Sequence, residues 1–275
     1  MGPPPRVCAV SYLNTSPLVW GFLHGPQRNR IELSFALPSE CAERLRAGEA
    51  DIGLPPSIEV ARQDTLAAIP GCSISSRGPA GSVLLVCRRP IEDVESLAAD
   101  TGSRSSVALA QILLARKYQR RVTVRPHPPQ VDEMLEAADA ALIIGDRALR
   151  LAESGAGTGR RVYDLGEEWW NWTGLPMVFA VWAVRRDFPE AELAPLFQAS
   201  AEFGLERLAE IAAAEAPARG LPVELAHRYL TSNLYYGWGE EEARGLRLFL
   251  EHAAGLGLAP ARPIEILKTP ALAAP

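Results

Sequence analysis

The chain has 275 residues, of which 48% are hydrophobic and 22% are charged, as in an ordinary soluble globular protein. This length allows either one large domain or two lobes that each have a core of their own. The formal net charge of −5 and the isoelectric point near 5.5 argue against a nucleic acid as the partner, because phosphate binding requires an excess of basic residues.

The first quarter of the chain alternates strand and helix patterns. Short apolar stretches at residues 7–11, 33–37 and 50–54 predict buried strands. The segments between them, 17–25 and 38–48, predict helices, the second with Ser39 as N-cap and Gly48 just past its end. This order of strands and helices is typical of a parallel α/β sheet.

A second α/β run follows two more predicted strands, 72–76 and 82–88, which the turn RGPAG joins. Helices are expected at 91–98, from about Ser105, at 131–137 and after Asp146. Strands are expected at 122–126, 140–144 and 177–184. From Glu190 onward the pattern is helical, with interruptions at PARGLP and GWG.

The two α/β runs are of similar size, and the chain is expected to cross between them near Arg88 and again near residues 174–177. We therefore predict an α/β protein with two lobes that two extended crossover strands join. The first lobe would be discontinuous, with residues 1–87 and 178–275, and the second would hold residues 88–177. A small ligand would bind in the cleft between such hinged lobes.

Four widely separated cysteines, Cys8, Cys41, Cys72 and Cys87, stand in apolar contexts without CxxC spacing or a histidine cluster. They are interpreted as core thiols of a reducing compartment, and no metal site is predicted. The N-terminus has no apolar segment of signal-peptide length, and the longest apolar run, residues 177–184, is too short to span a bilayer. The sequence thus favours a cytoplasmic protein without a membrane partner.

Candidate site residues come from the carboxyl ends of the predicted strands, where parallel α/β proteins bind ligands. These positions hold hydroxyls and amides, few acids and no histidine. They hold neither a phosphate-binding glycine pattern nor the GxSxG turn of hydrolases. The predicted substrate-binding set is Thr15, Ser57, Ser76, Ser103, Arg104, Ser105, Ser106, Gly145 and Asp146, beside Asn14 and Ser82.

The turn GSRSS, residues 102–106, opens a predicted helix with three serines and Arg104 but no acid. Helix starts usually hold Asp or Glu, because carboxylates complement the partial positive charge there. Free N–H groups, hydroxyls and an arginine instead indicate a site for a carboxylate or phosphate. The alternative is that Ser103 or Ser105 only caps the helix while Arg104 is solvated.

Other candidates also have structural interpretations. Asn14 could satisfy turn backbone instead of binding substrate. Asp146 could cap the helix that follows it, an interpretation we favour over catalysis. The cluster of Trp169, Trp170 and Trp172 is more typical of hinge packing than of a stacking platform.

Six segments in order resemble the MqnA family, the chorismate dehydratases of the futalosine pathway of menaquinone biosynthesis. They are VSYLNTSPL, GEADIGLPPSIEV, ISSRGPAGSVLL, GSRSSVALAQILL, AALIIGDRAL and DLGEEWWNWTGLPMVFAVWA. The resemblance covers residues 7–186 and is looser beyond Pro189. Pro55, Ser105 and Met177 depart from the residues usual in the family, and none of these departures removes a polar site group.

The resemblance implies a two-lobed fold like that of type II periplasmic binding proteins. It also implies conversion of chorismate to 3-[(1-carboxyvinyl)oxy]benzoate and water without a metal or organic cofactor. Asn14 and Ser82 match the polar residues that the family places against the substrate, and Ser105 and Ser106 match a carboxylate-binding turn. Chorismate carries two carboxylates, which suits an acid-free turn with Arg104.

The predicted site offers no histidine, lysine or clear carboxylate base for removing a proton. Our hypothesis is that the enolpyruvyl carboxylate of the substrate takes the ring proton, while Asn14 and Ser82 position the substrate and assist hydroxyl departure. Two alternatives stay open, a 1,4-dihydroxy-6-naphthoate synthase-like enzyme of the same pathway and a small-carboxylate solute-binding protein. A homodimer is compatible with the sequence, which does not indicate an oligomeric state.

Overall fold

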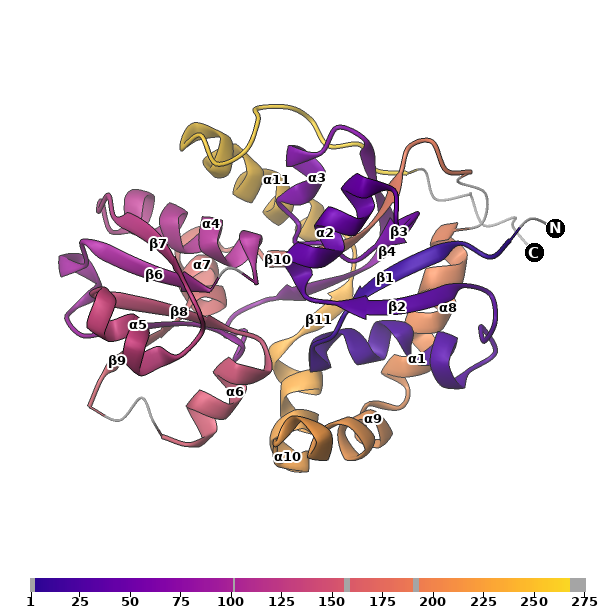
Figure 1. The fold of residues 1–275 in the computed structure, drawn as a ribbon, viewed down its shortest axis with the longest axis horizontal. Helices are drawn as coiled ribbons and strands as arrows, with labels where there is room; N and C mark the ends of the chain where they lie inside the picture. The colour runs from indigo at the N-terminus through magenta and orange to yellow at the C-terminus, as the bar shows by residue number, and fades with distance from the viewer. Residues whose placement is uncertain (1–2, 101, 156–158, 190–192, 268–275) are drawn as a thin grey trace.

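The computed structural model describes residues 3–100, 102–155, 159–189 and 193–267, which form two lobes that each contain a β-sheet (Figure 1). The chain begins in the first lobe, passes into the second at residues 77–82 and returns at residues 174–176. The first and the last described residues therefore belong to the first lobe, and the second lobe is inserted between two parts of it.

The sheet of the first lobe has the strand order β11-β4-β10-β3-β1-β2. These strands are β1 (Arg6–Val10), β2 (Glu32–Ala36), β3 (Ile52–Gly53), β4 (Leu66–Ser76), β10 (Met177–Arg185) and β11 (Tyr235–Gly237). β1 pairs in parallel with β2 and β3, as the strand–helix alternation predicts, whereas β10 is antiparallel to β3 and β4. The expectation of a parallel sheet is therefore correct only for its first part, because the returning strand β10 enters from the opposite end.

Helices cover both faces of this sheet. They are α1 (Ser16–His24), α2 (Pro38–Ala47), α3 (Glu59–Arg62), α8 (Leu193–Leu205), α9 (Leu208–Glu215), α10 (Val223–Arg228) and α11 (Glu240–Gly255). A 3₁₀ turn (Leu13–Thr15) precedes α1, and a π-helix (Tyr229–Asn233) follows α10. Residues 190–192, where the C-terminal helical pattern was expected to begin, lie outside the described residues.

Helix α2 shows how proline sets a boundary. It begins at Pro38, with Leu37 at the N-cap position, so the prediction of Ser39 as N-cap is wrong. The fixed φ of proline suits the first helical position, which moves the helix start one residue earlier. Gly48 ends the helix with a φ of 71°, as predicted.

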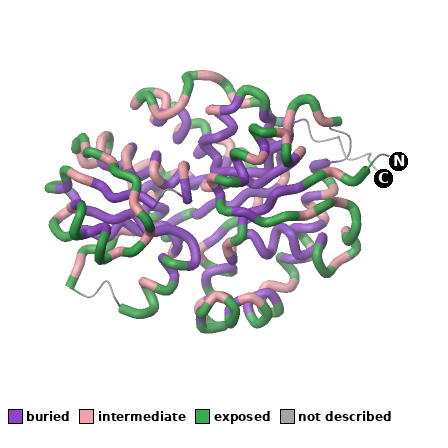
Figure 2. Tube along the Cα trace, viewed as in Figure 1, coloured by how far each residue is buried: buried purple, intermediate pink, exposed green. Residues whose placement is uncertain are grey.

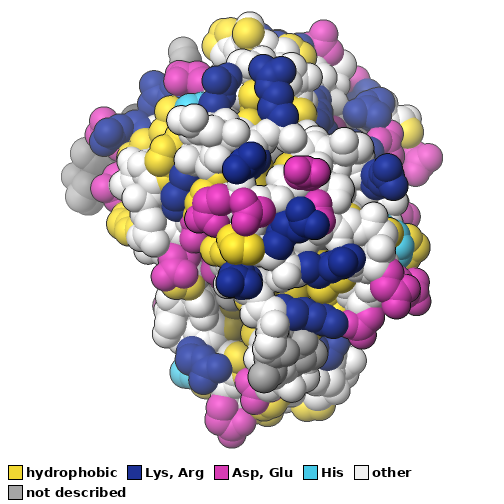
Figure 3. Space-filling view, turned by 90° about the vertical axis from the view of Figure 1, so that its left-hand side faces the viewer, with side chains coloured by type: hydrophobic (Ala, Val, Ile, Leu, Met, Phe, Trp, Pro, Cys, Tyr) yellow, Lys and Arg dark blue, Asp and Glu magenta, His cyan; other side chains and the backbone are white. Residues whose placement is uncertain are grey.

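The sheet of the second lobe has the order β7-β6-β8-β5-β9. Its strands are β5 (Val83–Cys87), β6 (Ser96–Asp100), β7 (Thr123–His127), β8 (Ala140–Ile144) and β9 (Arg161–Asp164). Its helices are α4 (Arg104–Ile112), which continues as a π-helix (Leu113–Lys117), α5 (Val131–Ala137), α6 (Asp146–Glu153) and α7 (Leu165–Thr173). Arg and acidic side chains lie interspersed on the outer face of this lobe (Figure 3).

Two expectations about this lobe are wrong. The first crossing lies at 77–82 and not near Arg88, because β5 pairs antiparallel with β8 and β9 and so belongs to the second sheet. The boundary after residue 87 must move accordingly. Residues 91–98 form a 3₁₀ turn (Ile91–Asp93) and the start of β6 instead of a helix. Their apolar spacing fits either structure, and burial of Leu97 and Ala98 between β7 and β8 decides for the strand.

Buried residues follow the central strands of both sheets (Figure 2), whereas the edge strands β2, β7 and β9 are mostly exposed or partly buried. All four cysteines are buried and free, which confirms their interpretation as core thiols. Trp169 of α7 is fully buried and packs against Trp172 and Phe249 beside the second crossing, as hinge packing predicts. In the described part of the chain, no helix has the length and apolarity that crossing a membrane requires.

Candidate functional site

A cavity lies between the lobes, where strands from both sheets end. The first lobe contributes Val10, Tyr12, Asn14, Pro38, Pro56, Ile74, Phe179, Ala180 and Leu234. The second lobe and the crossing segment contribute Ser82, Val83, Ser103, Ser106, Ile144 and Gly145. The two α/β runs thus place a cleft where the sequence predicts one.

Of the predicted site residues, Asn14, Ser82, Ser103, Ser106 and Gly145 line this cavity. Thr15, Ser57, Ser76, Arg104, Ser105 and Asp146 are not among its lining residues. The sequence reasoning missed Tyr12, Pro38 and Phe179 as lining residues, because apolar and aromatic side chains at strand ends give no local signal that separates them from core.

Gly145 is required by both conformation and space. Its φ of 64° favours glycine, and a Cβ there would lie 2.9 Å from the ring of Tyr12. Its N–H donates to the carbonyl of Ser82 at 2.8 Å. Gly145 therefore allows the Tyr12 ring to lie against the backbone, and its N–H links the end of β8 to the residue that precedes β5.

The serine turn both caps its helix and faces the cavity. Ser103 is the N-cap of α4, and its Oγ accepts the N–H of Ser106 at 3.3 Å. The Ser103 hydroxyl also donates to Ser106 Oγ at 2.9 Å. The first turn holds no acid, as the sequence indicates. The two interpretations of this turn, cap or ligand site, are thus compatible for Ser103.

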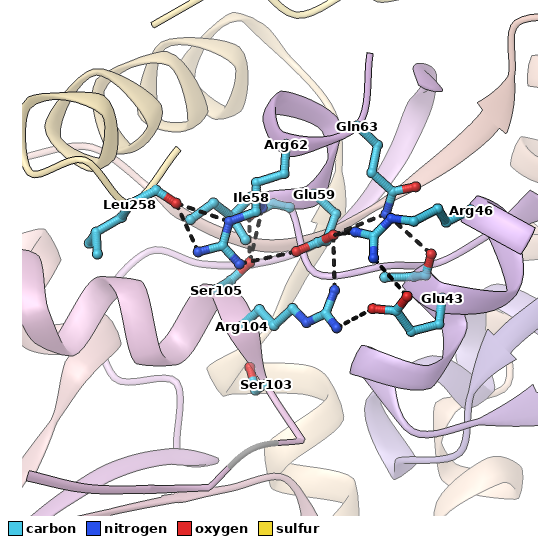
Figure 4. A network of polar contacts seen from close by, with 12 residues as sticks. Glu43, Arg46, Ile58, Glu59, Arg62, Gln63, Ser103, Arg104, Ser105 and Leu258 are labelled. Atoms are coloured by element: carbon cyan, nitrogen blue, oxygen red, sulfur yellow. Dashed lines mark hydrogen bonds and ion pairs between the residues drawn. The ribbon is translucent and has the colours of Figure 1, made fainter. Parts of the chain in front are cut away.

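Arg104 faces away from the cavity, toward the protein's own carboxylates (Figure 4). Its guanidinium bonds Glu43 of α2, and Nη1 lies 3.1 Å from Oε2 of Glu59 in α3. Glu59 is fully buried and also pairs with Arg62. A buried carboxylate needs cationic partners, which explains why Arg104 is directed there and corrects its expected place in the cleft.

Ser105 and Ser57 also join the lobes instead of lining the cavity. Ser105 Oγ accepts the N–H of Ile58 at 3.1 Å (Figure 4). It also lies 3.2 Å from Ser57 Oγ. The Ser57 hydroxyl donates to the carbonyl of Val178 at 2.7 Å. Both side chains are buried, and these bonds occupy them. Their roles in substrate binding stay predictions that no contact supports.

Asp146 begins α6 but caps a different segment. Its Oδ1 accepts the N–H of Leu13, in the 3₁₀ turn of the first lobe, at 3.1 Å. No side-chain cap bond forms within α6, so the prediction that Asp146 caps the helix that follows is wrong. Burial raises the pKa of this carboxyl, while the Leu13 N–H and Arg219 oppose the rise. Asp146 thus fixes the turn that carries Asn14.

The other two predicted residues, Thr15 and Ser76, do not line the cavity. The Thr15 hydroxyl lies 3.4 Å from Oδ1 of Asn14 and so contacts a lining side chain. Ser76 is fully buried, and its hydroxyl has no hydrogen-bond partner among the described residues. A Cβ on Gly166 of α7 would lie 2.5 Å from that hydroxyl, which places Ser76 against the helix instead of the cavity.

A buried tyrosine supports the lining from behind. Tyr229, at the start of the π-helix after α10, donates its hydroxyl hydrogen to Ser82 Oγ at 2.8 Å. The sequence reasoning missed this residue, because it is more than a hundred positions from Ser82 and belongs to no motif there.

The lining groups are hydroxyls, one amide and apolar side chains. Among the described residues that line the cavity there is no carboxylate, imidazole, ammonium or guanidinium. Tyr12 is the titratable group in this set, and burial raises its pKa to about 12. At neutral pH the cavity therefore offers neutral hydrogen-bond donors and acceptors without a strong base.

Comparisons with known proteins agree on family and fold. Residues 5–255 match a family model described as menaquinone biosynthesis. A chorismate dehydratase of Thermus thermophilus is 34% identical over 270 residues, which cover 90% of this chain and 94% of that protein.

Solved structures show the fold. An Archaeoglobus fulgidus protein superposes with a TM-score of 0.73 at 19% identity, over 93% of this chain and 98% of that one. A Candida albicans protein described as having the generic periplasmic binding protein fold gives a TM-score of 0.67 at 10% identity, over 98% and 97% of the chains. The two-lobed fold expected from the sequence is confirmed.

Proposed function

The chain belongs to the menaquinone biosynthesis family, and from that premise we propose that it is a chorismate dehydratase, a carbon–oxygen lyase that converts chorismate to 3-[(1-carboxyvinyl)oxy]benzoate and water. One observation carries the proposal beyond the similarity. The cavity between the lobes is lined by neutral donors and apolar groups, and none of the described residues that line it carries a strongly basic side chain.

The reaction removes one ring proton and one ring hydroxyl, and the ring becomes aromatic. Because the described lining residues supply no strong base, the enolpyruvyl carboxylate of the substrate takes the ring proton. The C–O bond breaks with its electron pair on the leaving oxygen, and that oxygen receives the proton to form water. Atoms and charges then balance without another reactant.

The protein's part is orientation and hydrogen bonding. Asn14 and Ser82 contact the substrate from opposite lobes and support the departing hydroxyl. Ser103 and Ser106, at the start of α4, face a substrate carboxylate. Orientation of this kind supplies roughly 7–11 kcal/mol of barrier reduction in favourable cases. The cytoplasmic location expected from the sequence is part of this proposal.

The direct test is to incubate the protein with chorismate and follow the ultraviolet spectrum of the benzoate product. Ser82→Ala and Asn14→Ala should each lower kcat by about 100-fold or more, the usual cost of losing one positioned donor. Ser232→Ala and Asn171→Ala change exposed residues of the same types and should leave kcat unchanged.

The rival functions give different results. Chorismate that binds and stays intact would indicate a solute-binding protein. If the protein leaves chorismate unchanged but converts a cyclic futalosine derivative, it would catalyse the 1,4-dihydroxy-6-naphthoate synthase reaction. Near wild-type rates in both site variants would reject the roles of Asn14 and Ser82 while leaving the overall activity in place.

A further inference from the structure

Tyr229 makes a contact that the scheme above does not use. The residue is 1% exposed and lies in the first lobe, far along the chain from the segment that it contacts. Its phenol hydroxyl donates to Ser82 Oγ at 2.8 Å. Tyr229 belongs to the buried hydrophobic cluster of the first lobe, and its hydroxyl bonds a side chain that lines the cavity.

This bond determines what Ser82 can offer a substrate. A serine hydroxyl has one donor hydrogen and accepts through two lone pairs. Because Tyr229 donates to the oxygen, the hydrogen of Ser82 is left for another acceptor. Ser82 lines the cavity, so an acceptor there, such as a leaving hydroxyl, can receive it.

The backbone around Ser82 is held as well. Its carbonyl accepts the N–H of Gly145 at 2.8 Å. The N–H groups of Ala80 and Gly81 donate to the carboxylate of Asp164 at 2.9 and 2.6 Å. With the backbone fixed, the bond from Tyr229 selects the orientation of the hydroxyl.

The phenol remains a donor over the whole working range of the protein. Burial raises the pKa of Tyr229 above its usual value, and the hydrogen bond with Ser82 only opposes this rise.

We propose that Tyr229 is a positioning residue for the dehydration, acting through Ser82. It orients the Ser82 hydroxyl so that its hydrogen bond stabilises negative charge on the departing oxygen, and Ser82 keeps its proton. This role rests on the proposed function.

The test is Tyr229→Phe, which removes one oxygen and keeps the ring. We expect kcat to fall about tenfold, because Ser82 then samples other orientations, while KM changes less than twofold. The matched control is Tyr236→Phe. Tyr236 is also a buried tyrosine, and its hydroxyl has no hydrogen-bond partner in the described part of the chain, so its removal should leave kcat unchanged. Thermal unfolding of both variants checks that the fold is retained.

A double-mutant cycle with Ser82→Ala separates positioning from a general structural effect. If Tyr229 acts through Ser82, adding Tyr229→Phe to Ser82→Ala causes no further loss of kcat. A full additional tenfold loss in that background, or wild-type kcat in Tyr229→Phe alone, would overturn the role of Tyr229. A wild-type protein that leaves chorismate intact would instead reject the proposed function, and this role with it.

Discussion

Two aspartates at strand ends of the second sheet, Asp100 and Asp139, have pKa values that are shifted in opposite directions. Asp100, at the end of β6, is 4% exposed; its Oδ1 accepts the Gly102 N–H at 2.8 Å, and its Oδ2 has no partner among the described residues. Burial raises the pKa of Asp100, with Gly102 and Arg147 opposing. Burial also acts to raise the pKa of Asp139, but hydrogen bonds from the Glu95 N–H and from Ser96 outweigh this effect and lower it.

Asp100→Asn should therefore stabilise the protein at pH 7. A pKa that is higher in the folded state means that the buried charge destabilises the fold above that pKa, and the penalty disappears as pH falls below the unfolded value. The gain in free energy of unfolding, measured with urea, should shrink between pH 7 and pH 4.

Asp139→Asn is the control with the opposite sign. Its lowered pKa stabilises the fold at all pH values above the ordinary aspartate value, so this variant should be destabilised to a similar extent at pH 7 and pH 5, and the loss should shrink only below about pH 4. Equal pH dependence of the two variants would contradict the electrostatic assignment.

At the scale of elements, one carboxylate holds helix α7 to the crossing segment. Asp164 is the N-cap of α7 and accepts the N–H groups of Gly166 and Glu167 through Oδ1 at 2.9 and 3.1 Å. The same side chain accepts the N–H groups of Ala80 and Gly81. The passage between the lobes and the start of the helix therefore share one anchor.

Asp164→Ala should lower the free energy of unfolding by about 3 kcal/mol, since a lost cap costs about 1 kcal/mol and two unsatisfied N–H groups cost more. Asp132→Ala removes an exposed acid at the start of α5 and should cost less than about 0.5 kcal/mol. Urea unfolding measures the free energy of unfolding of both variants. If the two variants lose similar amounts, the hydrogen bonds of Asp164 do not stabilise the fold.

At the scale of the whole molecule, polar bonds join the lobes around the cavity. Arg104 pairs with Glu43 and Glu59, and Ser105 bonds Ile58 on the same side. Asp146 bonds Leu13 from the second lobe to the first. These contacts favour the closed arrangement, whereas substrate entry requires the lobes to part.

Arg104→Ala should shift the ligand-free protein toward an open arrangement, by about 1.4 kcal/mol or tenfold for a partly buried ion pair. KM for chorismate should rise while kcat changes little, and small-angle X-ray scattering should give a larger radius of gyration that product restores. Arg160→Ala breaks an exposed ion pair with Asp132 and should leave KM and the radius of gyration unchanged. An unchanged radius in Arg104→Ala would refute the contribution of this pair to closure.

Local patterns predicted most elements of the fold. β1, β2, β8, α1 and α5 lie within one residue of their predicted bounds, because their apolar spacing and boundary residues are strong. The helix predicted at residues 91–98 was wrong for a physical reason. The later part of this segment forms β6 because it pairs with a strand on each side, β7 and β8, and the local sequence does not show this pairing. The misplaced first crossing has the same origin, because sheet membership depends on pairing across the chain.

The sequence by itself determined the two α/β runs, the family, the acid-free serine turn and the cavity positions of Asn14, Ser82, Ser103, Ser106 and Gly145, because strand ends and helix starts are set by local residues. Tertiary structure alone decided where Arg104, Ser105 and Asp146 point, and that Tyr229 meets Ser82. Each of these side chains was directed by a partner distant in sequence that needed a hydrogen bond or a counter-charge once buried, and only the folded arrangement supplies that partner.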